Sequence, residues 1–388
     1  MHVIFDTRPI QDHFSGIARY AYNLLAALPA HLRPGETLTA LHDPSAPNTH
    51  YDLAALAAIG IRMVDYRVPI FGLRNMVSAL QGAQHSSTSI YHSPYYLRPY
   101  LVSQPSVTTI HDMISFVYPQ FVPSLRARVL IRVFHALAIR ASRAIIAVSR
   151  SAAEDMARFF PSARRKIVVV PEAPDAVFAP QPQRRREAVR AKYNLPQHFA
   201  LFLASNKPHK NLERLIEAWA MVCRDESLTH RSLLLVIAGH QDPRYPHAQV
   251  RARELGLSQN VRFVGDVSNE DAAALYSTCE VFAFPSLYEG FGLPPLEAMA
   301  CGAPVACANT SSLPEVVGDA GLLFDPLDVG AIAAALKRLI GDDSLRADLR
   351  ARSLRQAARF TWADAARTTI DVYRTIAARR NAARHGSA

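Results

Sequence analysis

Residues 281–300, Val-Phe-Ala-Phe-Pro-Ser-Leu-Tyr-Glu-Gly-Phe-Gly-Leu-Pro-Pro-Leu-Glu-Ala-Met-Ala, combine a short apolar run, a glycine-containing loop and the start of a helix. The run Val281–Phe284 has no polar residue, which is typical of a strand covered on both faces of its sheet. Pro294 and Pro295 fit the first turn of a helix, where a missing N–H costs little. The stretch therefore predicts one strand–loop–helix unit of a parallel sheet.

Similar runs recur along the whole chain and are separated by longer stretches of helical pattern. This alternation indicates βαβ units, so we expect an α/β fold of two Rossmann-like, doubly wound parallel sheets. The predicted strands are Val3–Phe5, Val107–Ile110, Ala144–Val148, Ile167–Val170, Ala200–Leu203, Leu233–Ala238, Val261–Val264, Val281–Phe284, Pro304–Ala306 and Leu322–Phe324.

The domain organisation follows from the chain length and from one proline- and arginine-rich segment. A length of 388 residues suggests two domains, and residues 171–196 have the composition of a linker. We expect an N-terminal domain over residues 1–180 and a C-terminal domain over 181–361. A last helix within residues 362–388, predicted over Trp362–Ala378 and followed by a basic tail, is expected to pack back on the N-terminal domain.

The composition excludes several classes of protein. The chain is 49% hydrophobic and 20% charged, unlike a disordered or collagen-like chain, and no apolar run approaches the roughly 20 residues that span a bilayer. The N-terminus starts directly with a strand-like run and lacks the pattern of a secretory signal. The four cysteines form no CxxC pair, as in a cytosolic protein with reduced thiols.

The net charge of +10 is concentrated in one segment. Residues 113–166 contain ten Lys or Arg and two acids, Glu154 and Asp155. Within it, residues 125–139 mix apolar residues with Arg126, Arg128 and Arg132, as in a helix with one apolar and one basic side. Three explanations stay open: an anionic membrane surface, a solvated helix face and a nucleic-acid site. No zinc finger or RNP-type motif supports the last.

Two loops that follow predicted strands carry candidate ligand-binding groups. Gly290 and Gly292 allow close approach of the backbone, and a helix N-terminus after them suits a phosphate or a sugar. Glu289 and Glu297 can each accept two vicinal hydroxyls, although Glu297 in the first helical turn is equally explained as a favourable charge at the helix dipole. The second loop follows Leu203 and gathers cations and donors suited to a diphosphate: Ser205, Asn206, Lys207, His209 and Lys210.

The N-terminal half has weaker signals. His111 and Asp112 follow the strand Val107–Ile110, at the end where ligands bind in open α/β sheets, although a structural histidine explains His111 as well. Gly16 precedes a helix, but the G-x-G-x-x-G pattern of a dinucleotide site is missing. Tyr95, Tyr96 and Arg98 are candidates for acceptor binding, and the two tyrosines are also explained as loop packing.

Taken together, these motifs resemble family-4 retaining glycosyltransferases, whose two Rossmann-like domains face a cleft in the GT-B architecture. The resemblance is carried mainly by residues 288–328, with the E-x7-E pair, the YEGFGLP loop and the SSLPEVVGDAGLLFDP run. Shorter matches extend it over nearly the whole chain, at residues 16–20, 109–112, 148–150, 208–211 and 263–265.

The resemblance implies a role for each matching position. It places Glu289 beside the transferred sugar, Glu297 at the nucleotide ribose and Lys210 at the diphosphate. It places His111 beside the reacting carbon, so that the catalytic residues would be His111, Lys210 and Glu289. The donor-binding set that it implies, with the candidates of the second loop, is Gly16, Ser205, Asn206, Lys207, His209, Lys210, Val267, Glu289, Gly290, Phe291, Gly292, Leu293 and Glu297. The acceptor-binding candidates are Tyr95, Tyr96, Arg98 and Asp112.

One departure from the family pattern concerns the diphosphate. The family usually has an arginine next to the lysine or at the position of Ser205, and here those positions are His209 and Ser205. The charge of a histidine depends on pH near neutrality. Lys207 is our candidate for the second cation.

The resemblance implies a metal-independent hexosyltransferase that keeps the anomeric configuration, without a cofactor or a covalent nucleophile, and we find no DxD-like pair for Mg²⁺. We expect mannose transfer from GDP-mannose to a glycan or a polyprenyl-diphosphate-linked saccharide, in the synthesis of O-antigen, capsule or exopolysaccharide. The expected location is the cytoplasmic face of the inner membrane, bound peripherally to its anionic surface. Alternatives are a UDP- or dTDP-sugar donor, a sugar 2-epimerase or inverting enzyme, a non-catalytic nucleotide-sugar-binding protein, and a nucleic-acid binder.

Overall fold

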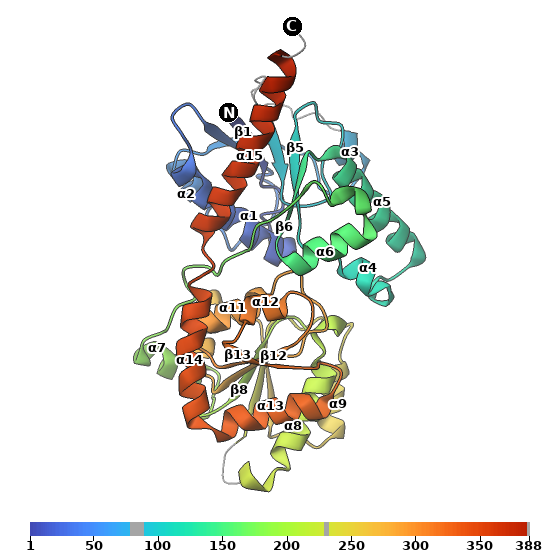
Figure 1. Ribbon diagram of the computed structural model, residues 1–388. Coiled ribbons are helices and arrows are strands. Elements are labelled where there is room, and N and C mark those ends of the chain that lie inside the picture. Colours follow the sequence, from blue (N-terminus) through green and yellow to red (C-terminus); the bar gives the residue numbers. More distant parts are fainter. Residues whose placement is uncertain (78–88, 229–232, 386–388) are drawn as a thin grey trace. The chain divides into compact units, whose positions relative to one another are not determined.

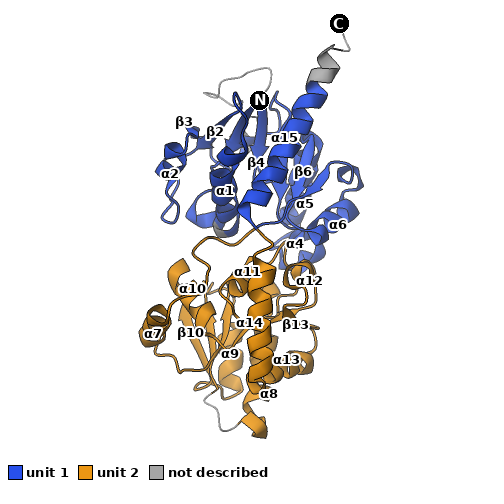
Figure 2. Cartoon of the chain, turned by 60° about the vertical axis from the view of Figure 1, so that its left-hand side comes forward, with its two compact units in different colours: residues 1–172, 361–388 blue, residues 173–360 orange. Residues whose placement is uncertain are grey.

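The computed structural model describes residues 1–77, 89–228 and 233–385, and the chain divides into two compact units (Figure 1 and Figure 2). Unit 1 comprises residues 1–172 and 361–388, and unit 2 comprises residues 173–360. The predicted boundary, between residues 180 and 181, lies eight residues beyond the observed one. The last three residues, 386–388, lie outside the described part of the chain.

Each unit is built from parallel strands and the helices that connect them. The strands of unit 1 are β1 (His2–Asp6), β2 (Thr37–His42), β3 (Arg62–Asp65), β4 (Ser89–Ser93), β5 (Ser106–Ile110), β6 (Ala144–Ala147) and β7 (Ile167–Val169), and its α-helices are α1 (Ser15–Ala27), α2 (Leu53–Ala58), α3 (Leu73–Val77), α4 (Ile114–Val117), α5 (Leu125–Ala141), α6 (Arg150–Phe159) and α15 (Trp362–His385). The strands of unit 2 are β8 (Ala200–Leu203), β9 (Leu235–Ala238), β10 (Val261–Gly265), β11 (Val281–Phe284), β12 (Val305–Ala308) and β13 (Gly321–Phe324), and its α-helices are α7 (Gln183–Lys192), α8 (Leu212–Cys223), α9 (His247–Glu254), α10 (Asn269–Thr278), α11 (Leu293–Ala300), α12 (Leu313–Val317), α13 (Val329–Gly341) and α14 (Asp343–Ala357).

The strand order confirms the predicted doubly wound α/β class. Within the described residues the unit 1 sheet is ordered β3-β2-β1-β4-β5-β6-β7 and the unit 2 sheet β10-β9-β8-β11-β12-β13, with parallel pairing throughout. The order reverses between β1 and β4 in unit 1 and between β8 and β11 in unit 2. Ligands of such sheets bind at these reversals, outside the carboxyl ends of the strands.

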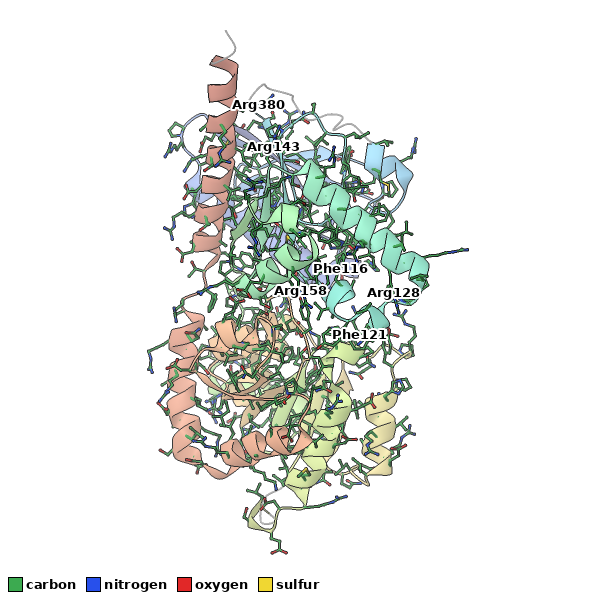
Figure 3. The ribbon with its side chains drawn as sticks, turned by 45° about the vertical axis from the view of Figure 1, so that its right-hand side comes forward. Phe116, Phe121, Arg128, Arg143, Arg158 and Arg380 are labelled. Carbon is green, nitrogen blue, oxygen red and sulfur yellow. The ribbon has the colours of Figure 1, made fainter. Side chains whose placement is uncertain are left out.

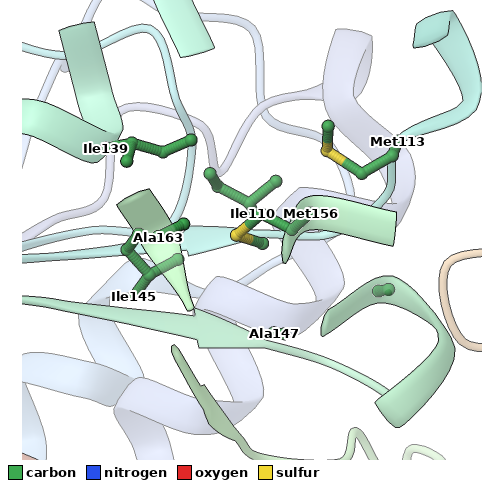
Figure 4. Packing of buried hydrophobic residues seen from close by; sticks show 8 residues of the cluster. Ile110, Met113, Ile139, Ile145, Ala147, Met156 and Ala163 are labelled. Carbon is green, nitrogen blue, oxygen red and sulfur yellow. The ribbon is translucent and has the colours of Figure 1, made fainter. Parts of the chain in front are cut away.

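Apolar side chains between the sheet and its helices form the core of each unit. In unit 1, one cluster joins Ile110 of β5 and Ile145 of β6 to Ile139 of α5 and Met156 of α6 (Figure 4). All four side chains are at most 2% exposed. Serine caps set where these two helices begin, because Ser124 accepts a hydrogen bond from the amide of Ala127 and Ser149 one from the amide of Ala152.

The structure corrects the predicted elements at three points. Strands β2, β3 and β4 are absent from the predicted strands, and His92 of β4 is fully buried. The predicted linker contains α7. The last helix continues to His385 through the residues expected to form a basic tail (Figure 1).

Helix α5 leaves a row of apolar side chains exposed. Leu125, Val129 and Val133 are 74%, 54% and 45% exposed, and Leu137 continues the same four-residue spacing, which places them along one face. The opposite face buries His135, Ala138 and Ile139. Arginines flank the exposed row, including Arg128 (Figure 3). No helix among the described residues is long and apolar enough to cross a membrane.

Candidate active site

The main candidate residues of unit 2 lie at the reversal between β8 and β11. The loop after β8 carries Ser205 to Lys210, and the loop after β11 carries Glu289 to Gly292. Because β8 and β11 are neighbours and parallel, both loops leave the same edge of the sheet. The topology thus brings together two stretches that are some 80 positions apart in the chain, between Lys210 and Glu289.

An ion pair between Lys210 and Glu289 joins the two loops. Lys210 Nζ donates to Glu289 Oε1 at 2.6 Å, and the two side chains are only 11% and 13% exposed. A short 3₁₀ turn, Pro208–Lys210, places the lysine, and its ammonium lies 5.2 Å from the ring centre of Phe284. The pair places one cation and one carboxylate at the carboxyl ends of β8 and β11. A cation can bind a phosphate, and a carboxylate can accept a hydrogen bond from a sugar hydroxyl.

The backbone of the second loop is fastened to the segment after β12. The amide of Glu289 donates to Ser311 Oγ at 2.9 Å, and Ser312 Oγ lies 3.0 Å from the carbonyl of Glu289 and 2.5 Å from that of Phe291. Ser312 is fully buried. Our sequence analysis did not single out these two serines as site residues, although both lie in the quoted SSLPEVV run.

Helix α11 begins directly after this loop. Its N-cap, Gly292, has φ +117°, and a Cβ there would lie 2.9 Å from Leu313 Cδ2, so the position suits glycine in both respects. Pro294 and Pro295 have no N–H, so the amides that this helix end can offer to an anion come from the preceding residues of the loop and from Leu293.

Glu297 differs from its predicted placement. It is the fifth residue of α11 rather than part of the first turn, and it is 3% exposed. Because the helix dipole acts mainly within the first turn, the charge–dipole explanation weakens.

The loop after β8 includes side chains already engaged within unit 2. Asn206 is 8% exposed, and its amide nitrogen donates to the carbonyls of Asp242 and Tyr245 at 3.0 and 2.8 Å, while its oxygen accepts from the amide of Asp242. This side chain therefore fastens two loops together instead of facing a ligand, contrary to our expectation. Ser205 is half-buried and Lys207 is exposed.

His209 supplies no charge to this loop. Burial lowers its pKa to about 2, with the cations Lys210 and Lys207 acting in the same direction. The side chain is therefore neutral at any physiological pH, and its backbone carbonyl accepts from the amide of Leu287 at 2.8 Å. The lowered pKa argues against His209 as the second cation at the diphosphate.

Val267 lies apart from these groups. It is half-buried and follows β10, which is the edge strand of the sheet and two positions from β8.

In unit 1, four predicted residues line one cavity of about 220 Å³ at the carboxyl ends of β4 and β5: Tyr95, Tyr96, His111 and Asp112. Tyr96 stacks on His135 with ring centres 3.9 Å apart, and burial lowers the pKa of His135 to about 4. The cavity is therefore aromatic and uncharged on that side. Gly16 is exposed at the start of α1, and a Cβ there would meet nothing within 4 Å.

Arg98 does not join this cavity. The side chain has no exposed surface, donates to the carbonyl of Pro99 and to Thr108 Oγ1 at 2.9 Å each, and lies over the ring of Tyr91. Its guanidinium supports β5 from inside the unit, so the expected contact with an acceptor is wrong for this arrangement.

His111 is held by two acceptors. Its Nε2 lies 3.0 Å from the carbonyl of Pro94, and its Nδ1 lies 3.0 Å from Glu172 Oε1. The ring also meets the edge of Tyr20, with ring centres 4.7 Å apart. Glu172 was not a candidate in the sequence analysis, because 61 residues separate it from His111 and no motif links the two.

No group of three or more His, Cys, Asp or Glu side chains that could hold a metal ion occurs in the described parts of the chain.

Two family models match this chain and together cover most of it. The model "Glycosyl transferases group 1" matches residues 185–356, and "Glycosyltransferase Family 4" matches residues 14–178. The chain is 33% identical to O-antigen chain mannosyltransferase B of Escherichia coli, over 97% of this chain and 100% of that protein.

Solved structures show the same fold. Sucrose-phosphate synthase from Thermosynechococcus elongatus superimposes with a TM-score of 0.70 at 20% identity, covering 97% of this chain and 99% of the other. The Anabaena protein Alr3699/HepE in complex with UDP-glucose has a TM-score of 0.70 at 16% identity, covering 97% and 100%.

Proposed function

The chain belongs to the group 1 and family 4 glycosyltransferases and is a hexosyltransferase, and from this premise we propose that it transfers mannose from GDP-mannose to a saccharide acceptor with retention of configuration. The observation that carries the choice of mannose is the near full-length similarity to an O-antigen chain mannosyltransferase. The acceptor that we propose is a lipid-linked saccharide of a cell-surface polysaccharide.

The geometry of unit 2 supports a donor site at the Lys210–Glu289 pair. Cleavage of the bond between the anomeric carbon and the diphosphate leaves negative charge on the leaving group and positive charge on the sugar ring. Lys210 and the amides before α11 would stabilise the diphosphate, and Glu289 would accept hydrogen bonds from the sugar. The ion pair positions both side chains before a donor arrives, so little reorganisation is needed.

Lys207 is the second cation that we assign to the diphosphate. His209 is neutral, and Lys207 is exposed three residues before Lys210 in the same loop. We expect Lys207→Ala to weaken donor binding by about tenfold, the equivalent of one charge-assisted hydrogen bond. Unchanged donor affinity and turnover in this variant would leave Lys210 as the sole cation of our proposal.

Acceptor binding is assigned to the unit 1 cavity. Tyr95 and Tyr96 offer ring faces and hydroxyls of the kind that sugars use, and Asp112 is exposed at its rim. The exposed apolar row of α5 with its arginines supports peripheral binding of unit 1 to an anionic membrane, where a lipid-linked acceptor would be found.

The deciding experiment is a panel of nucleotide sugars tested for protection against thermal unfolding. A ligand at 100 times its dissociation constant adds roughly 2.7 kcal/mol to the free energy of unfolding. We expect protection by GDP-mannose and its loss in Lys210→Ala. Protection by a UDP- or dTDP-sugar instead would overturn the donor, and protection without product would identify a binding protein.

Two further measurements test the chemistry. NMR of the product anomer distinguishes retention from inversion. Because we propose that protein cations neutralise the leaving diphosphate, turnover is expected to persist in EDTA, and its loss with recovery on adding Mg²⁺ would contradict metal independence.

A further inference from the structure

Unit 2 contains a pocket of about 650 Å³ at the amino ends of its strands β8 and β11. The donor loops lie at the carboxyl ends of the same strands. Helices α7 and α14 line the pocket, together with the segments that precede β8 and β11. Because each strand is four residues long, about 13 Å of strand separates the amino ends from the carboxyl ends.

The pocket has an excess of positive charge. Four of its lining residues are arginines, Arg186, Arg190, Arg346 and Arg350, and the one carboxylate among them is Glu280. That carboxylate is already engaged, since His198 Nδ1 lies 3.0 Å and Arg346 Nη2 lies 3.5 Å from its Oε1. Arg346 also pairs with the exposed Asp343, whereas Arg186, Arg190 and Arg350 form no ion pair with any described residue.

Two of the arginines have donors to spare. The Nε of Arg186 is buried and has no hydrogen-bond partner, although its Nη2 donates to Gln183 at 3.0 Å. Arg190 forms no hydrogen bond or ion pair with any residue that the structure describes. A buried N–H without an acceptor is costly, so an anion that reaches Arg186 relieves an existing penalty.

The other two arginines are fixed in place by backbone carbonyls. Arg350 donates to the carbonyls of Cys279 and Gly302 at 2.8 and 3.0 Å, and Arg346 donates to that of Ile340 at 2.7 Å. Burial lowers the pKa of Arg350, and the neighbouring charges of Arg346 and Arg186 act in the same direction. Rigid, mutually repelling cations form a pre-organised site for a multiply charged anion.

We infer that this arginine pocket binds a soluble diphosphate or phosphorylated carbohydrate, at a site separate from the donor loops. Guanidinium groups match phosphate oxygens by paired hydrogen bonds, and the volume exceeds what a single phosphate fills. Leu195 is the one aliphatic side chain in the lining, and the lining has no Phe, Tyr or Trp. The surface thus suits phosphate and hydroxyl groups rather than a nucleobase or an acyl chain.

The test is calorimetric titration of the full-length protein with inorganic diphosphate. Arg186→Gln/Arg190→Gln is expected to weaken one class of sites by at least about tenfold. Arg184→Gln/Arg185→Gln is the matched control, because it removes the same charge from the same helix at residues that do not line the pocket. Arg190→Gln alone breaks no intramolecular bond and provides a variant that we expect to fold.

The outcomes separate the alternatives. Equal binding by wild type and both pocket variants overturns the inference, as does equal weakening in the matched control, which would indicate unspecific charge attraction. If the pocket variants lose binding to phosphatidylglycerol vesicles but keep binding of diphosphate, the pocket binds a lipid headgroup. That result would contradict our inference of a soluble phosphorylated ligand. Lys210→Ala should leave this class of sites intact, so failure of the proposed donor site would not be mistaken for failure here.

Discussion

At the scale of single residues, the contact with Glu172 fixes the orientation of His111, the histidine that we propose to be catalytic. Both ring nitrogens face acceptors, the carbonyl of Pro94 and the carboxylate of Glu172. Glu172 therefore acts as a positioning residue that orients the ring of His111.

Glu172→Gln tests this role. The amide keeps an acceptor for Nδ1 but removes the carboxylate charge, so we expect kcat to fall by about tenfold with the donor KM unchanged. Glu154→Gln, at an exposed position of α6, is the control. An unchanged kcat in Glu172→Gln would show that Glu172 does not position His111.

Two buried histidines of unit 1 make its stability depend on pH. Burial lowers the pKa of His92 to about 3 and that of His135 to about 4. The unfolded chain binds a proton at each near pH 6.5 and the folded chain does not, so the free energy of unfolding falls as the pH drops below about 6.5.

We expect acidification from pH 7.5 to 5.5 to lower the free energy of unfolding by roughly 1 kcal/mol per histidine. His135→Phe keeps an aromatic ring beside Tyr96 and cannot be protonated, so its unfolding midpoint in urea should fall less than that of wild type over the same range. An equal fall of the unfolding midpoint in wild type and His135→Phe would show that His135 does not contribute to the pH dependence.

The sequence indicated which residue types gather at the donor edge, but not how each side chain is used. Lys210 and Glu289 were predicted from motif positions, and their ion pair fits that placement. Asn206 and Arg98 have the same chemistry as ligand-binding residues, yet Asn206 donates to carbonyls of a distant loop and Arg98 donates to Pro99 and Thr108, and no motif shows these contacts. For the same reason Glu172 could not be linked to His111.

At the scale of elements, α5 differs from an ordinary surface helix. Its buried face has few large side chains, while Leu125, Val129 and Val133 are exposed in a row. The sequence predicted an apolar and a basic side and left a membrane surface and a solvated face open, because periodicity does not show which face meets the sheet.

Val129→Gln/Val133→Gln tests the membrane role of α5. Each exposed valine would bury apolar area in the interface, so the pair should weaken binding to anionic vesicles by at least about tenfold. The melting temperature should hardly change, since neither side chain packs inside the unit. Met221→Gln/Val250→Gln, at exposed positions of unit 2, is the matched control, and an equal effect there would contradict a specific surface.

Whether a strand or helix could be predicted from the sequence depended on how apolar its buried residues are. Strands of Val, Ile and Phe buried on both faces were found, whereas β4 was missed because Ser89, His92 and Ser93 are polar, although all are buried. Helix α7 escaped prediction because its sequence has one buried apolar residue, Val189, and therefore no periodicity.

At the scale of the whole molecule, the chain leaves unit 1 after Glu172 and returns to it at Thr361. Helix α15 then contributes buried Ile370 and Tyr373, and Tyr373 Oη lies 2.5 Å from His92 Nδ1 of β4. Arg374 pairs with Glu36 at 2.7 Å, and its hydrogen bond lowers the pKa of that carboxyl group. Helix α15 is thus part of the core of unit 1.

Deleting residues 361–388 should unfold unit 1 and leave unit 2 folded. The lost burial of Ile370, Val372, Tyr373 and Ile376 amounts to more than about 5 kcal/mol, comparable with the whole stability of a domain. Calorimetry should then show one remaining transition. Deletion of residues 381–388 is the control, because it spares these side chains, and two intact transitions in the longer deletion would contradict this account.

The return of α15 also sets an order of events during synthesis. Unit 2 has all of its residues once Phe360 has been added, whereas unit 1 lacks one of its helices until α15 has been translated. At roughly 5–20 residues per second, the ribosome needs about 10–40 s to pass from Glu172 to Thr361. Throughout that interval the site that α15 will cover on unit 1 is open, and nascent chains at this stage would be clients for chaperones that recognise apolar surface.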